Sequence, residues 1–282
     1  MNTPRSELES LIEINSEELY YYTQTNTFLE KIIKPSSPNV LSIYFSHYKN
    51  LEDSKEFQLG IDIIKDFGWD SAYDKQLVSN KENRAPFQLS MSLAKDYYPM
   101  WKIYSKNVPC SSMSISNGPG VMLSFNKEKL LDDLRKDSRW ANVLPCFYDR
   151  QPEFAKVQNL LKEGMLHNTP SDFWFYSQLF NEYPSIVKSE QYSYEKEVRA
   201  IGIETSLRAQ KYNPYCHKEE IKAGKVFRPM EIDISTLTEI MIGPCSENTY
   251  EELKNKMNTL FQTIGCKITA EQITHSKIPV RE

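Results

Sequence analysis

Three charged residues, Glu195, Glu197 and Arg199, recur at every second position of the segment 192–201. Aromatic and β-branched residues alternate with charged ones in this segment, which predicts a β-strand. Residues two apart on a strand share a face, so the carboxylates are expected on one side, roughly 6–7 Å apart between Cα atoms. Such a pair suits a site that grips a sugar hydroxyl and activates a nucleophile. The same row also fits a solvated face in which Arg199 neutralises Glu197, and the residues alone leave both interpretations open.

Two further segments carry side chains that could line a pocket. Ser90 and Ser92 lie two apart on a predicted strand, and small hydroxyls on one side of a strand can form a pocket floor. Trp101 and Tyr104 lie three apart on a predicted short helix and could form a stacking wall for a nucleotide base or a nicotinamide ring. Each pattern also has a structural interpretation, as a polar strand face and as part of a hydrophobic core.

A third predicted strand, 19–23, carries Tyr21, Tyr22 and Thr23. On a strand Tyr21 faces away from Tyr22, so only one side of this strand can meet a ligand. The side that carries Tyr21 also carries Thr23.

The composition indicates a globular protein with a core rich in aromatic rings. The chain has 282 residues, of which 40% are hydrophobic and 12% aromatic, and it carries a net charge of −4. That charge gives no overall basic footprint of the kind that strong, non-specific nucleic-acid binding needs. The glycine patterns of dinucleotide-binding and P-loop folds do not occur.

Cysteine and histidine spacing argues against a metal centre. The five cysteines are scattered without a CxxC pair, and the four histidines show no metal-ligand spacing. We therefore expect reduced, mostly structural thiols and no metal. The N-terminal residues lack an apolar signal core and no run of about 18 apolar residues occurs, so we expect a soluble, cytoplasmic protein without membrane contact.

The order of predicted helices and strands, with no long linker, indicates one α+β domain over residues 1–282. Asn248 followed by Glu251 predicts the start of a C-terminal helix that ends at Gly265, and a last strand is expected at about 267–274. The C-terminal helix and strand together span 248–274, after a motif-bearing core of about 19–244.

Seven short motifs give this core a recognisable order. They occupy residues 19–23, 51–56, 90–92, 100–104, 120–125, 194–199 and 242–244. Their order and spacing resemble the motif series of an uncharacterised, mainly bacterial family, domain-of-unknown-function family 2971. That family is itself similar to ADP-ribosyltransferases. The resemblance implies a split, mostly antiparallel β core flanked by helices.

Site residues follow from the same resemblance. ADP-ribosyltransferases hold NAD with a His or Arg anchor on a first strand, a Ser- or Tyr-bearing second strand and a Glu on a third. Glu197 then corresponds to the catalytic glutamate that holds the 2′-hydroxyl of the nicotinamide ribose, and Glu195 faces the acceptor. Ser90 and Ser92 fall on the second strand, whereas Tyr21, at the anchor position, is neither His nor Arg.

The implied function is NAD-dependent ADP-ribosyl transfer, or NAD glycohydrolysis, with NAD as substrate. The residues expected to bind the nucleotide are Tyr21, Tyr22, Thr23, Ser90, Ser92, Trp101, Tyr104 and Arg199. The acceptor is a protein or a nucleic acid, and a partner protein is also expected. Similar bacterial proteins act as toxins or in defence against phage. The alternative is a non-catalytic nucleotide-sensing or partner-binding module that has lost the anchor. A nucleic-acid enzyme is a third interpretation.

Overall fold

The computed structural model describes residues 3–47, 56–66, 87–104, 119–137, 141–167, 172, 175, 179, 182–202, 220–222 and 225–279. The chain divides into two compact units. The first comprises Met1–Asn15, Phe45–Ser90 and Asp137–Arg228, and the second comprises Ser16–Tyr44, Met91–Lys136 and Pro229–Glu282. The predicted single domain stays a prediction, and each unit is described by itself. Most of the motif predicted at 51–56 lies outside the described residues.

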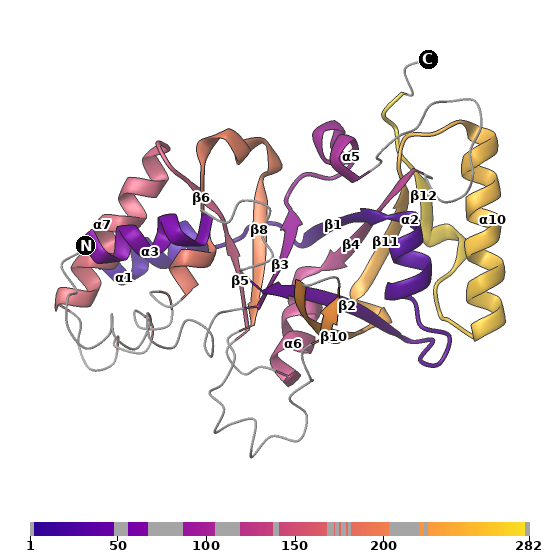
Figure 1. The fold of residues 1–282 in the computed structure, drawn as a ribbon, viewed down its shortest axis with the longest axis horizontal. Coiled ribbons are helices and arrows are strands. Elements are labelled where there is room, and N and C mark those ends of the chain that lie inside the picture. Colours follow the sequence, from indigo (N-terminus) through magenta and orange to yellow (C-terminus); the bar gives the residue numbers. More distant parts are fainter. Residues whose placement is uncertain are drawn as a thin grey trace. The chain divides into compact units, whose positions relative to one another are not determined.

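The second unit is built on a sheet whose strands follow the order β12, β11, β4, β1 (Figure 1). Their bounds are Ile273–His275, Leu237–Ile242, Gly120–Asn126 and Glu18–Gln24. β1 and β4 pair antiparallel from Glu18↔Asn126 to Gln24↔Gly120. β4 is buried from Gly120 to Phe125 on both faces, so it reads as an almost continuous apolar run.

Helices and turns complete the second unit. They are α2 (Thr25–Thr27), the π-helix η1 (Phe28–Ile32), α5 (Tyr98–Tyr104), α6 (Lys127–Asp137), η6 (Ile234–Thr236), α10 (Glu247–Ile264) and η7 (Ala270–Gln272). Figure 1 shows α10, in yellow, beside β12 and α2. The helix buries Tyr250, Leu253, Met257 and Phe261, and the Phe261 ring meets the edge of Phe28 at 6.3 Å.

The ends of α10 correct one prediction and confirm another. Ser246, not Asn248, is the N-cap, because its side chain accepts a hydrogen bond from the Thr249 N–H. The helix ends at Gly265 as predicted, and Gly265 adopts φ +71°, a conformation that glycine reaches without a steric penalty. The last strand begins at Ile273, later than predicted, after the turn η7.

The first unit packs helices around an apolar cluster beside short strands. Its helices are α1 (Pro4–Ile12), α3 (Glu56–Asp66), α7 (Pro152–His167), η4 (Tyr183–Ser185) and η5 (Glu190–Glu195). The cluster includes Leu8, Val157, Leu161, Tyr183 and Ile186. Thr3 caps α1, and Pro4 follows in the first turn, where a missing N–H has no cost.

Four strands of the first unit position the candidate site. β5 (Asn142–Pro145) pairs antiparallel with β8 (Glu197–Gly202), and β6 (Phe147–Tyr148) pairs parallel with β7 (Val187–Lys188). β8 also pairs with β3 (Phe87–Ser92). β3 in turn pairs antiparallel with β2 (Val40–His47). β9 (Glu220–Lys222) and β10 (Lys225–Asp233) form a further antiparallel pair.

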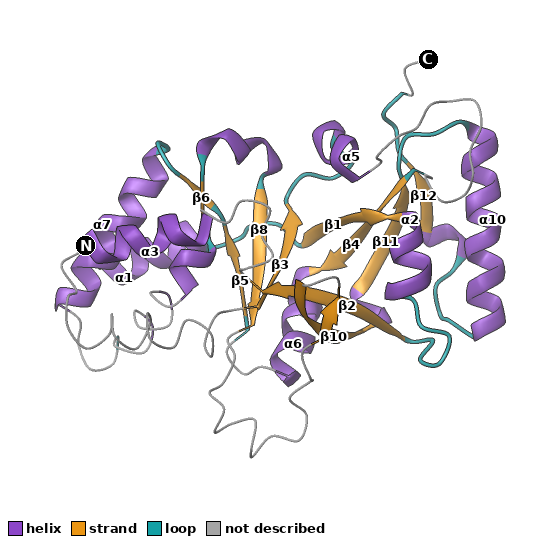
Figure 2. Cartoon of the chain, viewed as in Figure 1, coloured by secondary structure: helices purple, strands orange, loops and turns teal. Residues whose placement is uncertain are grey.

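These elements define an α+β fold, as predicted (Figure 2). The sheet pairing is mixed and mostly antiparallel, and β11–β12 and β6–β7 pair in parallel. No helix in the described ranges has the length and apolar character that crossing a membrane requires.

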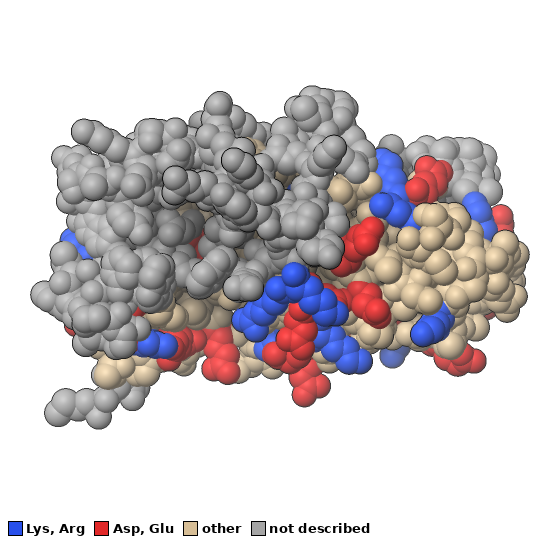
Figure 3. All heavy atoms as spheres, turned by 90° about the horizontal axis from the view of Figure 1, so that it is seen from below, with Lys and Arg blue, Asp and Glu red and all other residues tan. Residues whose placement is uncertain are grey.

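Charge on the surface is mixed on the face drawn in Figure 3. Blue and red side chains are interspersed over the part of that face that the structure describes. α6 also carries both signs of charge, with Glu128 in its first turn and Arg135 and Lys136 in its last, an arrangement that suits the helix dipole. This part of the face is therefore not a continuous basic surface of the kind that tracks a nucleic-acid backbone.

Candidate functional site

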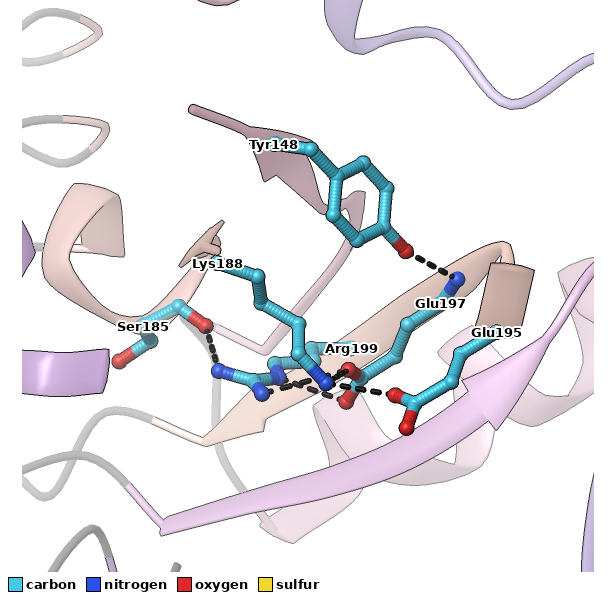
Figure 4. Close-up of polar contacts among 6 residues, drawn as sticks. All are labelled: Tyr148, Ser185, Lys188, Glu195, Glu197 and Arg199. Atoms are coloured by element: carbon cyan, nitrogen blue, oxygen red, sulfur yellow. Dashed lines mark hydrogen bonds and ion pairs between the residues drawn. The ribbon is translucent and has the colours of Figure 1, made fainter. Parts of the chain in front are cut away.

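Glu197, at the start of β8, lies at the centre of a buried group of charges (Figure 4). Arg199 Nε donates to Glu197 Oε1 at 2.7 Å, and Lys188 Nζ donates to Glu197 Oε2 at 2.5 Å. Lys188 Nζ also donates to Glu195 Oε2 at 2.6 Å. Glu197 is 5% exposed, Lys188 4% and Arg199 1%. We call Glu195, Glu197, Lys188 and Arg199 together the carboxylate–cation cluster.

Backbone groups fix the cluster from two sides. The Glu197 N–H donates to the Tyr148 hydroxyl at 2.9 Å, and Arg199 Nη1 donates to the Ser185 carbonyl oxygen at 2.5 Å. Tyr148 belongs to β6 and Lys188 to β7, so the parallel β6–β7 pair carries two of the contacts that hold β8. Figure 4 shows the Lys188 ammonium between the carboxylates of Glu195 and Glu197.

The strand predicted over 192–201 begins only at Glu197. Residues Glu190–Glu195 form the 3₁₀ turn η5, and Lys196 adopts the left-handed conformation with φ +46° and ψ +47°. A left-handed residue interrupts the extended backbone, so Glu195 does not share a strand face with Glu197 and the prediction is wrong on this point. The two carboxylates nevertheless converge, because both bind the Lys188 ammonium.

Burial excludes the alternative interpretation of this row as a solvated strand face. β8 is buried continuously from Glu197 to Ile201, on both faces. The predicted pairing of Arg199 with Glu197 is present, but inside the protein instead of at its surface. Of the two acids, Glu195 is the more accessible, with 18% of its side chain exposed against 4% for Glu197.

The cluster determines the protonation state of Glu197. Burial alone raises the pKa of a carboxyl group, but the charges of Arg199 and Lys188 and their hydrogen bonds outweigh burial and lower the pKa of Glu197 to about 2. Glu197 is therefore an ionised carboxylate throughout the physiological pH range. An ionised carboxylate can stabilise positive charge but is a weak base.

This pKa predicts an acid-dependent loss of stability. The pKa of Glu197 is lowered from 4.5 in the unfolded chain to about 2 in the folded one, so its contribution is complete above pH 4.5 and is lost as the pH falls towards 2. Denaturant unfolding at a series of pH values should show the free energy of unfolding falling through this window. The fall should be shallower in Glu197→Gln, and parallel profiles for the two proteins would contradict this account.

The predicted ring pair lies in the second unit. Trp101 meets Tyr22 edge to face at 4.9 Å between centroids, and Tyr104 stacks on Tyr22 at 6.3 Å. Trp101 and Tyr22 are each 2% exposed and pack in a core cluster with three methionines, Met100, Met122 and Met241. The Trp101 indole N–H donates to Asp96 Oδ1 at 2.8 Å. Tyr104 is half-buried at the margin of this cluster.

Gly243, in the motif 242–244, makes room for the Trp101 indole. A Cβ at this position would lie 2.9 Å from Trp101 Cε3 and 3.1 Å from the Gly120 carbonyl oxygen. Gly243→Ala should therefore lower the free energy of unfolding by about 1–3 kcal/mol. Gly202→Ala is the matched control, because its Cβ would meet only the Phe87 carbonyl oxygen at 3.9 Å. Equal thermal shifts for the two variants would contradict the close contact.

The remaining predicted residues lie on β1 and β3. Thr23 is buried and Tyr21 is half-buried, and strand alternation places both on the face of β1 opposite Tyr22. Ser92 is fully buried and its hydroxyl accepts from the Ala94 N–H at 3.0 Å, while Ser90 is half-buried. The structure thus brings Glu195, Glu197 and Arg199 together in the first unit and gathers Tyr22, Trp101 and Tyr104 in the second.

Sequence reasoning missed Lys188, Tyr148 and Ser185. The available signal was Lys188 itself, a charged residue directly after the apolar pair Ile186-Val187. A lysine in a buried strand needs an acidic partner, and Glu195 and Glu197 follow within nine residues. Tyr148 and Ser185 contact Glu197 and Arg199 through hydrogen bonds that no local sequence pattern predicts.

The fold and the cluster define an α+β protein in which a buried carboxylate, Glu197, and a half-buried one, Glu195, share a buried lysine. Residues 100–200 match the model of a family described as "Protein of unknown function (DUF2971)". The matched range contains the whole carboxylate–cation cluster together with Trp101 and Tyr104, and it supports the predicted resemblance to this family. No curated protein and no solved structure matches the chain.

Proposed function

We propose that the protein is an NAD-dependent glycosyl-transfer enzyme of the ADP-ribosyltransferase type, moving ADP-ribose from nicotinamide to an acceptor or to water. One observation supports this most: Glu195 and Glu197 both bind one ammonium group, at 2.6 and 2.5 Å, so their oxygens lie within about 5 Å of each other. Carboxyl pairs at about this separation act together on one glycosidic centre in retaining glycosidases.

Glu197 takes the electrostatic role in this mechanism. When the bond between nicotinamide and ribose breaks, nicotinamide leaves with the bonding electrons and positive charge spreads over the ribose C1′ and ring oxygen. A carboxylate that is ionised at rest needs no proton transfer before it stabilises this charge. It can also accept a hydrogen bond from the ribose 2′-hydroxyl, provided that Lys188 or Arg199 yields a position on one of its oxygens.

Glu195 takes the acceptor role. Its side chain is the more exposed of the two, and it lies in the turn η5 directly before the left-handed Lys196. The attacking oxygen or nitrogen of the acceptor forms the new bond to C1′, and its proton passes to the Glu195 carboxylate. Lys188 positions both acids and stays protonated.

The other predicted contacts remain proposals drawn from the family resemblance. These are nucleotide binding by Tyr21, Tyr22, Thr23, Ser90, Ser92, Trp101, Tyr104 and Arg199. A protein or nucleic-acid acceptor, a partner protein, a role as toxin or in phage defence, and a cytoplasmic location have the same standing. The mixed charge in Figure 3 favours a protein acceptor over a nucleic acid on the face drawn, as far as the structure describes it.

A second candidate is a nucleotide-sensing or partner-binding module without catalysis. It is favoured by the surroundings of Glu197, because both carboxylate oxygens already bind cations of the protein and only 5% of the residue is exposed. Tyr21 in place of a His or Arg anchor points the same way.

Calorimetry separates these candidates. The purified protein is titrated with NAD, ADP-ribose and a short oligonucleotide, and nicotinamide release is followed in the same samples. Binding of NAD with turnover supports the enzyme. Binding of NAD or ADP-ribose without turnover supports the module, and oligonucleotide binding alone would contradict both.

A further inference from the structure

Gln88, on β3, has a buried side-chain amide with no hydrogen bond. The residue is 2% exposed, and neither its Nε2 nor its Oε1 has a partner in the described chain. A glutamine amide offers two donor hydrogens and an acceptor oxygen, and leaving such groups unpaired away from water is costly. Exchanging the amide oxygen and nitrogen does not remove the cost, because both atoms are unpaired.

Two buried acids of the first unit, by contrast, have hydrogen-bond partners. Glu182, 1% exposed, accepts hydrogen bonds from Asn142 Nδ2 at 3.0 and 3.2 Å, and Glu197 binds two cations. Among the described residues, Gln88 is the one whose two side-chain polar atoms are both buried and unpaired. Buried polar groups are normally satisfied, so this exception calls for a ligand or another specific cause.

Gln88 lies on the strand next to the one that carries the site, at the end of β3 whose Phe87 carbonyl oxygen lies near Gly202 of β8. β3 pairs with β8, the strand that carries Glu197 and Arg199, and Figure 1 shows the two strands side by side. On its other edge β3 pairs with β2, where Ser46 is opposite Gln88. Strand alternation places Gln88 on the same face as Ser90, one of the residues predicted to contact the nucleotide.

We infer that Gln88 is a substrate-recognition residue, whose side-chain amide pairs with a planar group that presents an N–H donor beside an acceptor. This inference rests on the proposed function. NAD carries two such groups, the carboxamide of nicotinamide and the N6–N7 edge of adenine, and glutamine forms a two-point contact with either. Binding satisfies both orphaned atoms at once, so specificity for this group is large in comparison with a single hydrogen bond.

The experiment compares NAD with two analogues, each altered at one of these groups. In 3-acetylpyridine adenine dinucleotide the carboxamide is replaced by an acetyl group, and in nicotinamide hypoxanthine dinucleotide the adenine amino group is replaced by oxygen. Dissociation constants are measured by calorimetry for the wild type, Gln88→Leu and the close steric match Gln88→Met. Gln262→Leu, an exposed position on α10, controls for the chemical change.

The wild type should bind NAD at least tenfold more tightly than one of the analogues, and the analogue that loses affinity identifies the recognised group. Gln88→Leu and Gln88→Met should bind NAD and that analogue equally, with a melting temperature equal to or above that of the wild type. Gln262→Leu should keep the wild-type preference. Two outcomes would overturn this inference and leave the proposed function standing. In the first, both Gln88 variants keep the wild-type affinity for NAD and the wild-type preference over the analogues. In the second, the wild type binds NAD and both analogues equally well. A wild type that does not bind NAD would overturn the proposed function and, with it, this inference.

Discussion

Replacing Arg199 by Met should lower the free energy of unfolding by about 3–5 kcal/mol, the cost of leaving a buried charge without its partner. Arg199 is 1% exposed, and its guanidinium binds Glu197 Oε1 at 2.7 Å and the Ser185 carbonyl oxygen at 2.5 Å. Methionine fills most of the same volume but supplies neither donor. Urea denaturation monitored by circular dichroism measures the difference.

Two further variants make this prediction specific. Arg135→Met, on the exposed side of α6, removes the same charge from the surface and should change the free energy of unfolding by no more than about 0.5 kcal/mol. The double variant Arg199→Met with Glu197→Gln removes one charge of each sign and should recover part of the loss. If Arg199→Met is as stable as Arg135→Met, the buried network does not hold the first unit together.

Local patterns predicted several elements because the necessary information lies within one segment. The apolar spacing of α10 and the glycine after it determine where the helix lies and where it ends. β4 likewise corresponds to a short apolar run that follows Gly118-Pro119-Gly120, a local pattern that favours a strand. The strand alternation that separates Tyr21 from Tyr20 and Tyr22 also holds, since Tyr20 and Tyr22 join the core cluster that contains Trp101.

The segment before β8 shows where local patterns fail. The alternation from Tyr192 to Lys196 favours a strand, yet η5 and the left-handed Lys196 replace it. The Glu195 carboxylate binds Lys188, and the same ammonium lies 4.9 Å from the centre of the Tyr192 ring. These contacts with β7 stabilise the turn relative to a strand, because tertiary contacts can outweigh the strand propensity of a local segment.

The candidate site was predicted in part for the same reason. Glu197 and Arg199 were paired correctly because strand geometry alone brings them together. Lys188, Tyr148 and Ser185 reach the site from separate elements. The Tyr148 hydroxyl accepts from the Glu197 backbone N–H, and the Ser185 backbone carbonyl accepts from the Arg199 guanidinium, contacts that no side-chain pattern reveals. Trp101 had two interpretations, a stacking wall for a ring and part of a hydrophobic core, and its indole packs in a core cluster over Gly243.

Glu197→Gln should reduce kcat for nicotinamide release from NAD by about 10²–10³-fold, the usual effect of removing one preorganised electrostatic contact from a transition state. Glutamine keeps the size of the side chain and can still meet a ribose hydroxyl, but it carries no charge to set against the positive ribose. Glu182→Gln is the matched control, since Glu182 is a buried acid of the same unit that is held by Asn142, outside the carboxylate–cation cluster.

The rate of nicotinamide release by the purified protein, measured side by side for the wild type, Glu197→Gln and Glu182→Gln, tests the central proposal most directly. We predict turnover by the wild type and by Glu182→Gln, and a loss of at least a hundredfold in Glu197→Gln at saturating NAD. Equal rates in the wild type and Glu197→Gln, or no release by the wild type, would contradict the assignment of this carboxylate pair to glycosyl transfer.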